Sequence, residues 1–308
     1  MTIQGWALIL VFVALTVALA KPVGVWLHAL YEGRSTPLHR VLGPVERGFY
    51  RLAGINPAAE QSWRRYAVHM LLFQLVLLLF TYAVLRLQGA LPMNPRGLPG
   101  VSADGAMNAA ISFTTNTNWQ WYSGEVVMSN LSQMLGLTIQ NFLSAATGIA
   151  IAFALFRGFA RRECATVGNF WADCTRVTLY LLLPACLGYA LFLIASGAPQ
   201  TFSSSVEATT LEGIKQTIVT GPIASQEAIK MLGTNGGGFL NANSAHPFEN
   251  PTALTNLVQM LSIFAIGAGL TWCFGKAVGN TRQGWAILAA MMVLFLAGAG
   301  ITYWQEAA

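Results

Sequence analysis

The sequence ASQEAIKMLGTNGGGF at residues 224–239 joins a short, moderately apolar segment to a polar run rich in glycine. The apolar part, 224–232, has room for two or three helical turns, well short of the roughly 20 residues that a helix needs to cross a bilayer. A second stretch, DGAMNAAISFTTNTNWQ, repeats this arrangement, with its apolar part at 104–113 and its polar run at 114–120. We therefore predict two short helices, each followed by a polar loop.

Each polar run is followed by a variant of one phrase, SNLSQML at 129–135 and TNLVQML at 255–261. A long apolar segment precedes each short helix, and another begins at each phrase. Because both the order of the segments and their wording recur, the sequence contains an internal repeat of spanning helix, short helix, polar loop and spanning helix.

The composition is that of an integral membrane protein. Of 308 residues, 55% are hydrophobic and 9% are charged, whereas a soluble domain is about 25% charged. We read the first apolar run as a retained helix that ends at Lys21-Pro22, because it lacks the basic n-region and the cleavage site of a signal peptide. The six candidate spanning segments are 5–20, 66–87, 131–156, 177–194, 254–274 and 285–303.

These patterns predict an all-α polytopic membrane protein with six spanning helices, built from helix/pore-loop/helix units like those of potassium channels. We divide the chain into four parts. They are an N-terminal spanning helix with a basic cytoplasmic segment (1–65), a first repeat (66–157), a second repeat (158–276) and the first helix of an incomplete third repeat (277–308).

The basic residues predict the orientation, because cytoplasmic loops of membrane proteins keep the positive charge. Lys and Arg concentrate in segments 21–65, 157–176 and 276–282, so we expect these inside and the N-terminus outside. The net charge of +5 then reflects membrane sidedness, and a nucleic-acid partner is not needed to explain it. We expect the inner segment 34–65 to meet membrane lipids with anionic headgroups, a partner subunit, or both.

The two polar loops have the chemistry of a cation site. Irregular backbone at membrane depth is tolerated where it lines a cavity, and carbonyl oxygens there can replace the hydration shell of an ion. We expect the run Gly236-Gly237-Gly238 to accept positive φ angles. Threonine hydroxyls and asparagine amides can add oxygens or brace the loops. Neither run contains a carboxylate, which favours a weakly hydrated monovalent cation over calcium or magnesium.

Three stretches carry a resemblance to a known family: NTNWQWYSGE at 116–125, LTIQNFLSAATGIA at 137–150 and the long segment 224–256. They closely resemble the family of potassium-transporting ATPase potassium-binding subunits (KdpA), part of a superfamily of potassium transporters. The resemblance implies a protein of the bacterial inner membrane that binds potassium from outside. It also implies an intramembrane tunnel to a separate P-type ATPase catalytic subunit, together with small accessory membrane subunits.

Carried over position by position, the family's selectivity filter falls on both polar loops, and potassium is the transported ion with no other tightly bound cofactor. We expect substitutions at Gln120 and Gly236 to change affinity or selectivity most. The candidate potassium-binding residues are Thr115, Asn116, Thr117, Asn118, Gln120, Thr234, Asn235, Gly236 and Gly237.

The family has four such repeats around one pore, whereas this sequence holds two and the first helix of a third. Two loops cannot surround an ion. We therefore expect either a piece of a longer protein, which we favour, or a second polypeptide that supplies the missing half.

Other functions are less consistent with the sequence. There is no Walker A or aspartyl-phosphate motif, so ATP hydrolysis would belong to another chain. A stand-alone potassium channel or ion-coupled symporter of the same superfamily stays open. The repeats run in parallel, which disfavours a transporter built on inverted repeats. We expect Lys230 to pair with Glu227, and His69 to be a packed or interfacial residue.

Overall fold

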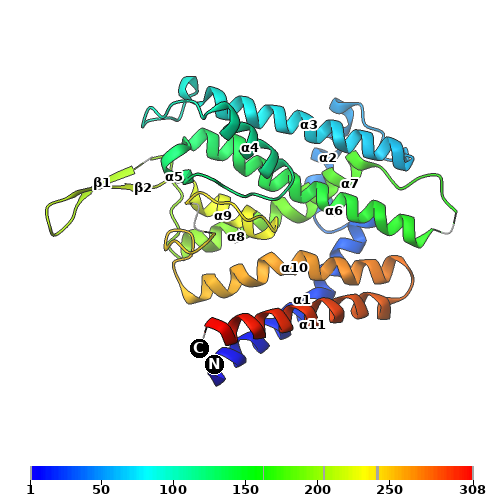
Figure 1. Ribbon diagram of the computed structural model, residues 1–308. Helices are drawn as coiled ribbons and strands as arrows, with labels where there is room; N and C mark the ends of the chain where they lie inside the picture. The colour runs from blue at the N-terminus through cyan, green and yellow to red at the C-terminus, as the bar shows by residue number, and fades with distance from the viewer. Residues whose placement is uncertain (1, 162, 204, 241–242, 307–308) are drawn as a thin grey trace.

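The computed structural model describes residues 2–161, 163–203, 205–240 and 243–306, and these are mostly helical (Figure 1). Six helical spans in the described ranges are long and apolar enough to cross a membrane, which confirms the predicted number. They are formed by α1 (Ile3–Tyr31), α3 (Trp63–Leu87) with η1 (Gln88–Ala90), η2 (Ser132–Thr138) with α6 (Ile139–Ala160), α7 (Phe170–Val177) with η3 (Thr178–Leu182) and α8 (Leu183–Ala195), α10 (Ala253–Ala277), and α11 (Thr281–Glu306).

The prediction that the first helix ends at Lys21-Pro22 is wrong. Pro22 lies inside α1, which continues to Tyr31. A proline removes one backbone hydrogen bond, but the residues after it pack tightly against α10. A Cβ atom at Gly24 would lie only 2.7 Å from the Gly269 carbonyl oxygen. Packing at this close approach keeps the chain helical beyond the proline, as small residues do at helix interfaces in membranes.

The two predicted short helices are present, within one residue of the expected bounds at each end. They are α4 (Ala103–Thr114) and α9 (Ile223–Leu232). The Ser102 hydroxyl oxygen caps α4 by accepting a hydrogen bond from the Gly105 N–H at 3.3 Å. Helix α4 packs against α3, and α9 packs against α8. Both lie toward the same end of the helical bundle, together with the short helix α5 (Gly124–Val127) (Figure 1). We call this the loop end.

A β-hairpin projects from the loop end (Figure 1). Its strands β1 (Ser205–Thr209) and β2 (Lys215–Val219) are antiparallel, with Ser205 opposite Val219. The sequence analysis does not predict this hairpin, which lies between the fourth spanning segment and the second short helix. The turn includes Gly213 at φ +81°, a conformation that glycine adopts without steric cost.

The opposite end of the bundle, which we call the basic end, holds α2 (His39–Ala53) and a network of ion pairs. The Arg157 guanidinium donates to both Asp173 carboxylate oxygens at 2.6 and 2.8 Å, and the Tyr66 hydroxyl donates to the same carboxylate at 3.1 Å. Arg176 pairs with Glu46 at 3.1 Å. The first group of contacts ties α3, α6 and α7 together, and the second joins α2 to α7.

Candidate functional site

The two polar loops, 114–120 and 233–239, lie directly against each other although they are more than 100 residues apart in sequence. The Gln120 amide makes a reciprocal pair with Gly238 of the other loop. Its Nε2 donates to the Gly238 carbonyl oxygen at 3.1 Å, and its Oε1 accepts from the Gly238 N–H at 3.0 Å. A glutamine amide thus pairs with a backbone unit in the way that one strand pairs with another.

Asn116 forms the second link between the loops. Its Oδ1 accepts from the Ser144 hydroxyl at 2.7 Å and from the Asn235 Nδ2, while its Nδ2 donates to the Gly233 carbonyl oxygen at 3.5 Å. Because Ser144 belongs to α6, this asparagine fixes both loops to a spanning helix. The expectation that asparagines brace the loops is confirmed at Asn116 and Asn235, whereas the buried Asn118 amide has no hydrogen-bond partner among the described residues.

Each loop leaves its short helix by the same local route. The Thr117 and Asn118 N–H groups both donate to the Ser112 carbonyl oxygen, at 3.0 and 2.9 Å, and the Asn235 N–H donates to the Lys230 carbonyl oxygen at 3.0 Å. The turns that follow place non-glycine residues at positive φ: Asn116 at +62°, Asn118 at +55° and Thr234 at +56°. Asparagine tolerates this region better than most residues, whereas a β-branched threonine there is unusual and is held by its surroundings.

The predicted glycine mechanism is wrong in its physical detail. Among the described residues, Gly236, Gly237 and Gly238 do not have positive φ angles. They supply space instead. A Cβ at Gly237 would lie 2.5 Å from the Asn118 carbonyl oxygen and 2.8 Å from the Phe113 ring, whereas one at Gly236 would meet only the Thr117 carbonyl oxygen, at 3.5 Å. Gly237 in particular allows the second loop to approach the first.

The nine predicted residues divide into two sets by exposure. Along each loop the exposed and the more buried positions alternate. The exposed set is Thr115, Thr117, Thr234 and Gly236, and the set that is buried or half-buried is Asn116, Asn118, Gln120, Asn235 and Gly237. The structure thus brings all nine together, with one set facing an open side and the other packed between the loops.

Several buried polar atoms beside the loops have no hydrogen-bond partner among the described residues. They include both amide atoms of Asn118, both of Asn141, the Asn235 Oδ1 and the Thr114 hydroxyl. A buried polar atom without a partner costs about 1–3 kcal/mol, so such a group of atoms indicates a place where water or an ion completes the bonding. The oxygen atoms in this group all belong to neutral amide and hydroxyl groups.

A cavity of about 440 Å³ opens from these loops toward the basic end. Its rim includes Thr115, Asn116 and Thr234, and its walls come from α3, α6 and α10. Most of the wall is apolar, with Leu71, Ile149 and Ile266 among the lining residues. The loops therefore stand above a space large enough for several water molecules.

Two glutamines from the repeated phrase support the second loop and the segment after it. Gln133 Nε2 donates to the Phe239 carbonyl oxygen at 3.2 Å, and Gln259 Nε2 donates to the Glu249 carbonyl oxygen at 2.8 Å. Gln226 Nε2 in turn donates to Gln133 Oε1 at 3.2 Å. The recurrence of the phrase indicates a repeat but does not by itself predict a role for these glutamines.

Residues 10–308 of the chain match the model of a family described as potassium-transporting ATPase A subunit. The chain belongs to this family. Three similar relatives are potassium-transporting ATPase potassium-binding subunits. Those of Granulibacter bethesdensis and Methylorubrum populi are 60% identical to this chain, and that of Bradyrhizobium diazoefficiens is 61% identical. The alignments cover 100% of this chain and 54% of each relative, so the chain spans about half the length of the curated relatives it matches.

The family assignment confirms the resemblance drawn from the three quoted stretches.

The predicted pairing of Lys230 with Glu227 is also confirmed. The ammonium and the carboxylate lie 2.5 Å apart. A second partner of Lys230 was not predicted: the Glu249 carboxylate lies 3.5 Å from the same ammonium. No spacing rule connects Lys230 with Glu249, since a non-helical segment brings them together.

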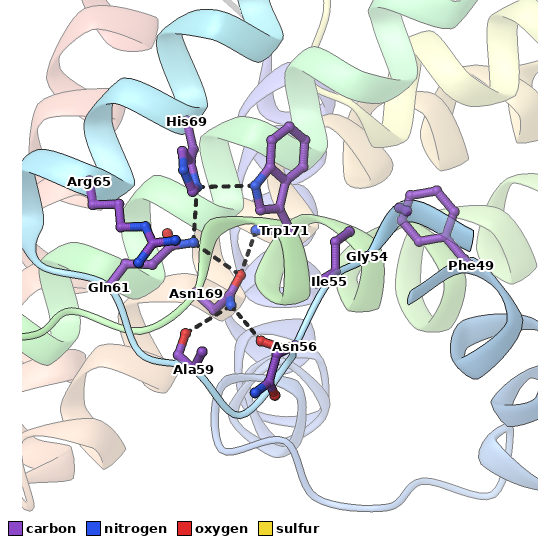
Figure 2. Close-up of a pocket in the computed structure, with 11 residues that line it drawn as sticks. Phe49, Gly54, Ile55, Asn56, Ala59, Gln61, Arg65, His69, Asn169 and Trp171 are labelled. Carbon is purple, nitrogen blue, oxygen red and sulfur yellow. Dashed lines mark hydrogen bonds between the residues drawn. The ribbon is translucent and has the colours of Figure 1, made fainter. Parts of the chain in front are cut away.

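His69 lies far from the loops, in a cavity of about 400 Å³ at the basic end (Figure 2). Its Nδ1 accepts hydrogen bonds from the Trp171 Nε1–H at 3.1 Å and from the Gln61 Nε2 at 3.0 Å. An indole N–H can only donate, so Nδ1 carries no proton and the histidine acts as an acceptor between α3 and α7. This agrees with the prediction of a packed or interfacial histidine.

Proposed function

We propose that this chain binds potassium at its two paired loops and forms part of the ion path of an ATP-driven potassium transporter. The observation that carries the proposal is the interlocking of the loops by Gln120 and Asn116, which presents the Thr117 carbonyl oxygen beside Gly236. The loops offer neutral oxygens and no carboxylate. Such a set of oxygens suits a weakly hydrated monovalent cation, because carbonyl dipoles can replace its water shell. They do not replace the more tightly held water shell of a divalent ion.

The ion site requires more than these two loops. The exposed set Thr115, Thr117, Thr234 and Gly236 would face the ion from one side only. We propose that residues 66–157 and 158–276 are two pore repeats, that 277–308 begins a third, and that 1–65 precedes the repeats. Further repeats, on the same polypeptide or on another, would close the ring. We call the resulting complex the assembled transporter.

Potassium would leave the loops through the cavity that they overlie, toward the energy-coupling partner. The relatives are named as potassium-binding subunits of a potassium-transporting ATPase. In this proposal the hydrolysis of ATP takes place on a separate P-type ATPase catalytic subunit, and small accessory membrane subunits complete the complex. This chain has no ATP-hydrolysis motif of its own, so its part is ion selection.

We place the chain in the bacterial inner membrane with its N-terminus and loop end outside. The argument is the distribution of Lys and Arg, which gather in the segments of the basic end. With this orientation, potassium enters from the external medium at the loops. The hairpin β1–β2 then lies in the external medium as well.

The arrangement of side chains on helix α2 favours a contact between this helix and anionic lipid headgroups of the inner leaflet. Its buried face carries Glu46 and Tyr50, and a second face carries Arg40, Arg47 and Arg51. No carboxylate among the described residues pairs with these three arginines. A third face exposes the apolar side chains Val41, Val45, Phe49 and Leu52. A helix with apolar and basic faces of this kind lies in the interface plane, where it meets acyl chains and phosphate groups together.

The first test is ATP hydrolysis by the assembled transporter in mild detergent, titrated with potassium and separately with sodium. Hydrolysis stimulated by potassium and not by sodium is the expected result. Potassium flux in liposomes without an associated ATPase would instead favour a channel or symporter of the same superfamily. Equal stimulation by the two ions would contradict the assignment of the loops as a potassium site.

A further inference from the structure

Three charged side chains lie together behind the second loop with almost no contact with solvent. Lys230 and Glu249 are 0% exposed and Glu227 is 1% exposed. The Lys230 ammonium lies 2.5 Å from the Glu227 carboxylate and 3.5 Å from that of Glu249. Burying an ion pair is costly unless its geometry and hydrogen bonds are nearly complete, so a buried triad beside an ion-binding loop needs a reason beyond stability.

The two carboxylates also accept hydrogen bonds from the segment that leaves the loop. Glu249 accepts from the Leu240 N–H at 3.2 Å and from the Ser244 N–H at 3.0 Å, and the Ser244 hydroxyl donates to Glu227 at 2.5 Å. The triad thus joins α9, which enters the loop, to the segment that leaves it. It holds both ends of the loop at once.

The triad also touches the loop backbone itself. A Cβ at Gly238 would lie 2.7 Å from the Lys230 Nζ and 2.8 Å from the Glu249 Oε1. Gly238 is the residue whose backbone pairs with Gln120 of the first loop. A continuous series of contacts therefore runs from the buried charges through Gly238 to the opposite loop.

We infer that Lys230, Glu227 and Glu249 form a charged clamp that positions the second loop for cation selection, with two carboxylates offsetting the lysine charge that would otherwise repel the ion. These are positioning residues, since their contacts reach the loop and not the ion. A lone ammonium near the loops would oppose cation entry, and a lone carboxylate would bind a cation without discrimination. With two carboxylates and one ammonium the clamp has a formal charge of −1, so it holds the loop in place without repelling a cation. This inference rests on the proposed function.

Two variants of the assembled transporter test the clamp. Glu249→Gln keeps the size of the side chain but removes one charge and one acceptor. The double variant Lys230→Met with Glu227→Gln removes the closest ion pair and leaves Glu249 as a lone buried carboxylate. Lys215→Met is the matched control, because Lys215 is an exposed lysine on the hairpin at the same end of the molecule.

The readouts are the potassium concentration for half-maximal transport and the preference for potassium over rubidium, each measured per folded transporter. For Glu249→Gln we expect the half-maximal concentration to rise about tenfold, the effect of one unit charge at about 10 Å with an effective dielectric constant near 20. Both variants should lose most of the preference for potassium over rubidium, and Lys215→Met should lose neither. If one variant fails to fold, the other still decides the question.

A purely structural triad would lower the yield of folded transporter and leave both readouts unchanged in what remains. That result, or equal changes in Lys215→Met, would overturn the clamp while leaving the potassium site intact. If the unaltered transporter itself shows no preference for potassium over sodium, the proposed function fails and the clamp fails with it. The two failures are therefore separated by the behaviour of the unaltered protein.

Discussion

The two loops occupy equivalent places in the repeat, yet they are held by different chemistry. The first loop is shaped by amide side chains and by two asparagines at positive φ, Asn116 and Asn118. The second loop is shaped by two glycines that allow close approach, Gly237 and Gly238, and by buried charges behind it. The first loop contributes the side chains of Gln120 and Asn116 to the interface, whereas the second contributes mainly backbone groups, with Asn235 as its one side chain in these hydrogen bonds. An internal repeat can thus keep one arrangement while holding its two copies by different means.

The largest effect is expected from Gln120→Arg, which replaces the first-loop side chain that pairs with the second loop. The change removes the reciprocal pair with Gly238 and adds a positive charge beside the loops. We expect the potassium concentration for half-maximal transport to rise by about two orders of magnitude, as for a unit charge about 5 Å away at an effective dielectric constant near 20. Gln120→Glu is the matched control of opposite charge, and an equal loss in both variants would assign the effect to the lost pair alone.

Gly236→Asp tests the exposed glycine of the second loop. A Cβ there has ordinary contact distance to the Thr117 carbonyl oxygen, so the side chain fits without a steric clash. The new carboxylate should weaken selection for potassium over sodium by about tenfold, because a charged oxygen also binds more strongly hydrated cations. Gly236→Asn, of nearly the same shape and without charge, separates charge from size. Unchanged selectivity in the aspartate variant would contradict the assignment of Gly236 to the ion site.

Gly237→Ala tests whether space is what the second loop requires. The added methyl group would lie 2.5 Å from the Asn118 carbonyl oxygen, and overpacking of this kind costs about 1–3 kcal/mol. We expect a lower unfolding temperature and weaker potassium affinity. Gly236→Ala is the control at the neighbouring position, where only a 3.5 Å contact forms. Similar behaviour of the two alanine variants would show that close approach does not distinguish these glycines.

Asn116→Gly separates backbone strain from hydrogen bonding in the first loop. Glycine accepts the φ of +62° freely but lacks the amide that contacts Ser144, Asn235 and Gly233. We expect a net loss of about 1–2 kcal/mol in the free energy of unfolding, since partners left unsatisfied in a buried site cost more than the relieved strain returns. Asn116→Ala should lose more, because it keeps the strain. Greater stability of the glycine variant would show that strain dominates.

The smallest effect is expected from a change at the basic end, which serves as a reference for the changes in the two loops. A hydrogen bond from Arg161, with a further one from Thr166, lowers the pKa of Glu60 from 4.5 to about 2. A carboxyl group with a depressed pKa stabilises the folded state above its unfolded pKa and loses that contribution as the pH falls toward 2. Because this side chain is half-exposed, the effect should stay below about 1 kcal/mol.

Thermal unfolding of Glu60→Gln measures this contribution. The unaltered protein should be slightly more stable than the variant at pH 6, and the difference should shrink as the pH falls from 4.5 to about 2. Potassium transport at pH 7 should be the same in both. A change in potassium affinity would mean that the basic end is coupled to the loops.

Much of the fold followed from local patterns. Six spanning segments and two short helices were predicted within a few residues at most bounds, because apolar length is a local property of the sequence. The end of α1 was missed, since the contact of Gly24 with α10 outweighs a proline. The hairpin β1–β2 was also missed, because an isolated exposed pair of strands leaves little signal in a long polar connector.

The sequence alone determined the class of protein, the positions of both loops and the family, because hydropathy and a long specific phrase need no spatial information. Only the tertiary structure decided how the loops meet. Distant segments are joined by the pairing of Gln120 with Gly238 and by the contact of Lys230 with Glu249. The division of the nine loop residues into exposed and packed sets follows from how the loops pack. Such contacts depend on how helices pack, and a linear pattern records the residues but not their approach.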